Sequence, residues 1–70
     1  MPVTTELWTL DARALAVAVF ISPDAFLVST YHQGQLYATA GDTDPAMLIG
    51  LHDRLVTSGF DLAERDYIIV

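Results

Sequence analysis

The sequence contains no cysteine and no lysine. Without cysteine, the chain has no disulfides, no thiolate zinc sites and no thiol catalysis. Three basic residues face nine acidic ones, for a formal net charge of −6. Binding to nucleic acid needs cations that displace condensed counterions, and an anionic membrane surface attracts the same residues. Neither is therefore expected as a direct partner, whereas a protein partner with a basic surface suits this charge.

Long hydrophobic runs are also missing. The longest uninterrupted apolar run is Ala14 to Ile21, far shorter than the ~20 residues that cross a bilayer. No basic segment precedes this run and no signal-peptide cleavage pattern follows it. We therefore expect a cytoplasmic protein with one compact domain over residues 1–70. A domain this small without disulfides must rely on a well-packed core or on a partner subunit, and 53% of its residues are hydrophobic.

The apolar residues alternate in a pattern that predicts mostly strands. Residues 14–21 place large side chains between alanines, which favours a strand, although a helix over 11–20 beginning at Asp11 is the alternative. Further strands are expected at 4–10, 26–32 and 35–40, with Gln33 and Gly34 as a tight turn. An acidic connection over 61–66 then precedes a short last strand at 67–70.

One helix is expected, from Ala46 to about Ser58. Asp44 suits the N-cap, Pro45 suits the first helical position, and Gly59 suits the position after the C-cap. The predicted fold class is therefore α+β. It comprises an antiparallel sheet of four to five strands with one helix packed on one face, in the order strand-strand-strand-strand-helix-strand.

Pairing the strands through their turns places Phe20 opposite Leu27 and Ala18 opposite Ser29. It also places Tyr31 opposite Leu36 and Ser29 opposite Ala38. One face then carries mainly small side chains, and we expect the helix there because small residues allow close approach. That face comprises Ala14, Ala16, Ala18, Phe20, Leu27, Ser29, Tyr31, Leu36, Ala38 and Ala40.

The second sheet face is equally apolar, whereas a solvated face should alternate apolar with polar residues. The segment around Trp8, a second copy of the chain or another protein is expected to cover it. Its candidate interface residues are Val17, Val19, Ile21, Phe26, Val28 and Tyr37.

No arrangement of side chains predicts chemistry. Asp42 and Asp44 could ligate a cation, but the remaining oxygen ligands of a calcium loop are missing, so a turn and helix cap are expected. None of the serines lies in a Gly-x-Ser-x-Gly elbow. His52 is expected to be a core histidine bonded to backbone, although a small-molecule pocket around His52 and Tyr31 is an alternative. The prediction is a non-enzyme with no catalytic, metal or cofactor site.

The acidic residues are the remaining candidate site. Most lie at turns and element ends, where they keep an apolar chain soluble or, alternatively, dock on a basic groove. The predicted partner-binding residues cluster around the two ends of the helix and are Asp42, Asp44, Asp61, Glu64 and Asp66.

With its Asp-rich turns, small size and lack of catalytic motifs, the chain resembles phage-encoded anti-CRISPR and anti-restriction inhibitors. The resemblance implies stoichiometric binding to a defence effector complex such as CRISPR-Cas in the host cytoplasm. The acidic surface would then act as a DNA mimic on a basic nucleic-acid-binding site, without chemistry. The alternative is a structural module that homodimerises or joins a larger complex through the second apolar sheet face.

Overall fold

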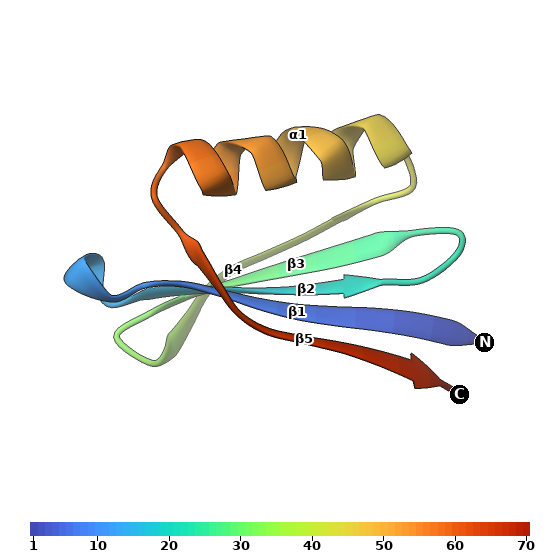
Figure 1. The fold of residues 1–70 in the computed structure, drawn as a ribbon, viewed down its shortest axis with the longest axis horizontal. Coiled ribbons are helices and arrows are strands. Elements are labelled where there is room, and N and C mark those ends of the chain that lie inside the picture. Colours follow the sequence, from blue (N-terminus) through green and yellow to red (C-terminus); the bar gives the residue numbers. More distant parts are fainter.

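Five strands and one helix make up the computed structural model, which describes residues 1–70 (Figure 1). The elements are β1 (Pro2–Leu10), the short 3₁₀ turn η1 (Asp11–Arg13), β2 (Leu15–Ile21), β3 (Phe26–His32), β4 (Gln35–Asp42), α1 (Pro45–Thr57) and β5 (Asp61–Ile69). All strand pairs are antiparallel. The predicted α+β class and the predicted order of the elements are confirmed.

The sheet has the strand order β4-β3-β2-β1-β5. Strands β1 to β4 form consecutive hairpins, and α1 then crosses one face of the sheet so that β5 can pair with β1 (Figure 1). The two edges are therefore β4 and β5. The predicted pairs Phe20–Leu27, Ala18–Ser29 and Tyr31–Leu36 are confirmed. The predicted pair Ser29–Ala38 is wrong, because a register shift next to Tyr31 pairs Ser29 with Thr39.

The tight turns follow from local backbone preferences. Gln33 and Gly34 both have positive φ, at 53° and 79°, as a two-residue turn between twisted strands requires. Ala14 also has a left-handed backbone, with φ 52°, so it ends η1 and β2 begins at Leu15. The alternative of a helix over 11–20 is wrong, apart from the single 3₁₀ turn.

Helix α1 begins and ends as its sequence predicts. A carboxylate oxygen of Asp44 accepts a hydrogen bond of 3.0 Å from the backbone N–H of Ala46. At the other end Gly59 has φ 90°, and the N–H of Phe60 donates to the carbonyl of Leu55 over 2.9 Å. This is a Schellman-type C-terminus, which supplies partners for the last helical carbonyls.

The helix covers the opposite sheet face from the one expected. Trp8, Val17, Val19 and Leu55 form the buried core, and Val28 packs partly buried against it. The prediction that α1 packs on the small-residue face is wrong. The larger side chains of this face bury more apolar area beneath α1 than the alanine-rich face could.

Strand β5 is longer than expected. It starts at Asp61 rather than Tyr67 and pairs with nearly all of β1 through one irregularity at Leu7 and Trp8. The predicted acidic connection is therefore wrong. The backbone groups along β1 need hydrogen-bond partners, and a charged sequence at a sheet edge can supply them while its side chains stay in solvent.

The face opposite α1 has no covering element, and we call it the open sheet face. A register shift next to Tyr31 turns Thr39 toward this face and leaves Ala38 and Ala40 on the helix side. The strand pairings place on the open sheet face the uncharged residues Leu7, Ala16, Ala18, Phe20, Leu27, Ser29, Tyr31, Leu36 and Thr39. At its β5 edge the same face carries Asp61, Glu64 and Asp66.

Candidate functional site

A buried carboxylate lies beneath α1. Glu6 is on the helix-facing side of β1, opposite Val19, and its side chain is 0% exposed. Its Oε1 accepts hydrogen bonds from Trp8 Nε1 over 3.2 Å and from His52 Nε2 over 2.7 Å. Arg65 Nη2 lies 2.8 Å from the other oxygen, Oε2. One side chain thus links β1 to α1 and to β5.

These partners determine the ionisation of Glu6. Burial by itself raises the pKa of the carboxyl, because a charge loses its hydration. The hydrogen bonds from Trp8 and His52, with the positive charges of His52 and Arg65, outweigh burial and hold the pKa of Glu6 below its ordinary value. Glu6 is therefore a carboxylate at neutral pH, and the hydrogen-bonded His52 nitrogen carries the proton.

The two carboxylate oxygens have different surroundings. Oε2 accepts no hydrogen bond of good geometry, so its contact with Arg65 is ionic. The rings of Trp8 and His52 lie 5.7 Å apart at 36°, which keeps the imidazole against the sheet. Since the Glu6 side chain has no exposed surface, its polar contacts fasten the helix to the sheet.

The sequence alone did not predict this cluster. His52 was expected to bond to backbone, whereas it pairs with the Glu6 carboxylate. The available signal was that Glu6 shares a strand face with Trp8, two residues later. The alternative pocket around His52 and Tyr31 is also wrong, because Tyr31 lies on the open sheet face, away from α1.

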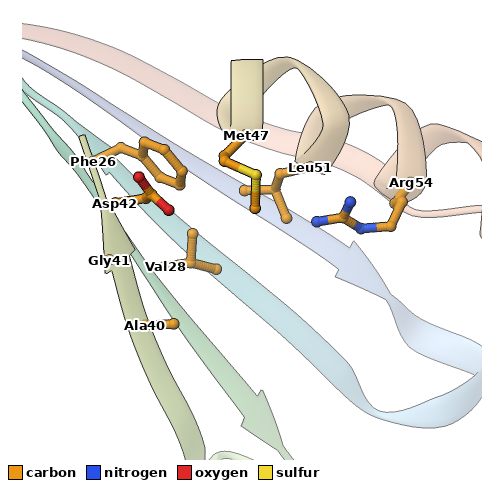
Figure 2. A pocket seen from close by; sticks show the side chains of 8 residues that line it. All are labelled: Phe26, Val28, Ala40, Gly41, Asp42, Met47, Leu51 and Arg54. Atoms are coloured by element: carbon orange, nitrogen blue, oxygen red, sulfur yellow. The ribbon is translucent and has the colours of Figure 1, made fainter. Parts of the chain in front are cut away.

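A small hollow lies between α1 and strands β3 and β4 (Figure 2). Its volume is about 200 Å³. Its lining residues are Phe26, Val28, Ala40, Gly41, Asp42, Met47, Leu51 and Arg54. Figure 2 shows Asp42 beside Phe26 at one end and the Arg54 side chain at the other, with Met47 and Leu51 between them. We call this hollow the β4 pocket.

The two charged residues of the β4 pocket differ in their partners. The Asp42 oxygen Oδ1 accepts hydrogen bonds from the backbone N–H groups of Thr43, at 2.7 Å, and Asp44, at 2.9 Å. This confirms the expected turn chemistry. Arg54 takes part in neither of the two ion pairs of the structure, so its guanidinium has no carboxylate partner.

The predicted acidic cluster is divided between the two sheet edges. Asp42 and Asp44 lie where β4 leads into α1, and their carboxylates bind local backbone. Asp61, Glu64 and Asp66 lie on β5, at the opposite edge. Asp42 and Asp44 thus lie beside the start of α1, and Asp61 follows its end, whereas Glu64 and Asp66 lie farther along β5.

The predicted apolar interface is largely occupied by the helix. Val17 and Val19 are buried in the core, and Ile21 and Val28 pack against it. A fifth member, Phe26, lines the β4 pocket. These residues are not free to bind a partner because α1 covers them.

Of the six predicted interface residues, Tyr37 remains prominent, at 78% exposed. The open sheet face also exposes large apolar side chains: Phe20 is 42%, Leu27 43% and Leu36 60% exposed.

Comparison of the chain with protein-family models, with curated proteins and with solved structures found no match. No group of three or more histidine, aspartate or glutamate side chains is arranged to hold a metal ion. The single helix, of 13 residues, does not have the length and apolar character needed to span a membrane.

Proposed function

We propose that the protein is a non-enzymatic interaction module that packs its open sheet face against a second copy of itself. The observation that carries this proposal is the apolar character of that face. Its large side chains Phe20, Leu27 and Leu36 are all more than 40% exposed, and no element of the chain covers them. Contiguous apolar surface of this kind is typical of interfaces.

Size and charge together allow a second copy. Four of the five strands, spaced about 4.8 Å apart with about seven residues of about 3.3 Å each, give an uncharged face of roughly 440 Å². Covering two such faces removes roughly 900 Å², in the range below about 1,200 Å² that is typical of weak, reversible protein contacts.

Charge restricts this contact to strands β1 to β4, whose part of the face has no charged residue. Asp61, Glu64 and Asp66 lie on the β5 part of the same face and stay outside the contact. Two sheets packed face to face form a sandwich, with the remaining carboxylates in solvent at its rim.

Leu27→Glu is expected to abolish this dimer. The substitution puts a carboxylate into the apolar contact, and an unpaired buried charge should weaken dimerisation at least about 100-fold. Sedimentation equilibrium at micromolar concentration should give the wild type twice the 7.7 kDa chain mass and the variant the single mass. The matched control is Ile49→Glu on α1, where the side chain is 71% exposed, and it should remain dimeric. A monomeric wild type at 100 μM concentration would contradict the proposal.

A second candidate is the inhibitor suggested by the acidic residues. Asp61, Glu64 and Asp66 follow one another along the exposed edge strand β5, and we call them the β5 acidic row. Such a row can occupy the phosphate sites of a basic groove. The partner would be the nucleic-acid-binding site of a defence effector complex such as CRISPR-Cas.

Reversal of the β5 acidic row to lysine should abolish such inhibition. The wild-type chain, expressed in a panel of bacteria whose CRISPR-Cas systems restrict a phage, should restore plaque formation in at least one strain. The triple-lysine variant should not. A control that reverses three acids elsewhere has the same net charge and should still inhibit. Its positions are Asp11, Asp24 and Asp53. The inhibitor proposal fails if no strain responds to the wild type, or if both triple variants behave alike.

A further inference from the structure

Strand β4 has one unpaired side. It is the last strand on its side of the sheet and pairs only with β3. All eight of its residues are exposed. The N–H and C=O groups that point away from β3 therefore have no strand partner, and such an edge is a template for another strand.

The two sheet edges are protected differently. Strand β5 carries four charged residues, Asp61, Glu64, Arg65 and Asp66. Charged side chains on an edge strand discourage the addition of another strand. On β4 no charge or proline occurs from Gln35 to Gly41. After the irregularity near Tyr37, the pairing of β4 with β3 is regular from Ala38 to Asp42. This stretch is therefore the part of the edge best suited to accept a strand.

The β4 pocket lies directly beside that stretch. Ala40, Gly41 and Asp42 line one side of it, while Met47 and Leu51 of α1 lie across from them (Figure 2). Its volume of about 200 Å³ is below the ~300–1,000 Å³ of pockets for drug-sized ligands. It suits one apolar side chain better than a separate small molecule.

The charged residues at the two ends of the pocket indicate which charged groups the ligand carries on either side of its apolar side chain. The unpaired Arg54 guanidinium suits a carboxylate, which it can bind through two parallel hydrogen bonds. Asp42 at the other end suits a cationic side chain. Asp42, Ala40 and Ala38 share the helix side of β4 at alternate positions. Side chains of an added strand would alternate in the same way.

We propose that the β4 edge and the β4 pocket bind an extended segment of a partner protein as an added antiparallel strand. Read from its N-terminus, the segment carries a basic, an apolar and an acidic residue at every second position. The basic residue meets Asp42, the apolar one enters the pocket beside Ala40, and the acidic one meets Arg54. This surface is separate from the open sheet face, so the inference does not depend on the proposed dimer.

Two blocked peptides of identical composition test the inference. The probe TVRTLTEVT has the required order of charges, and TVETLTRVT has the reverse order. Peptide binding is measured by fluorescence anisotropy with the Leu27→Glu variant, in which contact between two open sheet faces is disrupted. The first peptide should bind at least tenfold more tightly than the second, and its amide chemical-shift changes should concentrate on residues 38–42.

Two variants test the roles of the pocket residues. Arg54→Gln should weaken binding of the first peptide about tenfold, and Ala40→Trp, which fills the pocket from an exposed position, should abolish it. Arg13→Gln, a substitution of an arginine in η1, is the matched control and should bind normally. The inference is overturned if the first peptide does not bind at millimolar concentration. It is also overturned if the two peptides bind with equal affinity and neither Arg54→Gln nor Ala40→Trp changes the affinity for the first peptide.

Discussion

The double substitution His52→Ala and Arg65→Ala is expected to lower the free energy of unfolding by about 3–5 kcal/mol. It removes the His52 hydrogen bond and the Arg65 charge from Glu6, whose side chain is 0% exposed. The carboxylate then keeps only the hydrogen bond from Trp8, which leaves a buried charge without compensation. Domains of this kind have a total stability of about 5–15 kcal/mol, so urea denaturation at neutral pH should show a large shift in midpoint.

A third substitution separates this effect from lost packing. Glu6→Leu, added to the double variant, should recover most of the stability, because an apolar side chain there needs no cationic partner. Arg13→Ala is the control for loss of an arginine outside the cluster and should leave the midpoint unchanged. If the triple variant is less stable than the double variant, the cost comes from lost packing by His52 and Arg65, and the electrostatic explanation is wrong.

The elements that sequence analysis predicted well are those determined by local chemistry. Asp44 caps α1 with its own side chain, and Gly59 adopts the positive φ that ends it. The turn at Gln33 and Gly34 sets the pairing of Tyr31 with Leu36. Each of these features depends on residues close together in the chain, so single residue types carry enough information to predict them.

The face covered by the helix could not be predicted in the same way. Both faces of β2 and β3 are apolar, and hydrophobic pattern alone does not distinguish them. The choice depends on how much area α1 buries, which favours Val17 and Val19 over the alanines. It also depends on β1, which brings Trp8 onto the same face. A local bulge near Tyr37 further reverses the side on which Ala38 and Ala40 lie.

The buried cluster was beyond local reasoning for a related reason. Glu6 and His52 are 46 positions apart, and Arg65 joins them only because β5 runs along β1 from Asp61 onward. Once β5 was expected to be short, nothing indicated a cationic partner for Glu6. A charged residue on the same strand face as a buried tryptophan is the pattern that would have raised the question.

Acidification should destabilise the fold through the same carboxylate. The pKa of Glu6 in the folded chain lies below its ordinary value of 4.5, so the folded state releases this proton more readily than the unfolded state does. The stability gained in this way is fully present above pH 4.5 and is lost as the pH falls through the folded pKa. The unfolding free energy, measured by urea denaturation from pH 7 down to pH 2, should therefore decrease on the acidic side.

The contribution of Glu6 is isolated by comparing two amide substitutions. Glu6→Gln should lower stability at pH 7, where the carboxylate is paired. It should also flatten the decrease below pH 4.5, because the amide does not titrate. Glu64→Gln changes an exposed residue on β5 and should keep the wild-type slope. The slope of the unfolding free energy against pH equals the difference in bound protons between the unfolded and folded states, multiplied by a constant. Equal slopes for wild type and Glu6→Gln would therefore mean that protonation of Glu6 does not cause the loss of stability in acid.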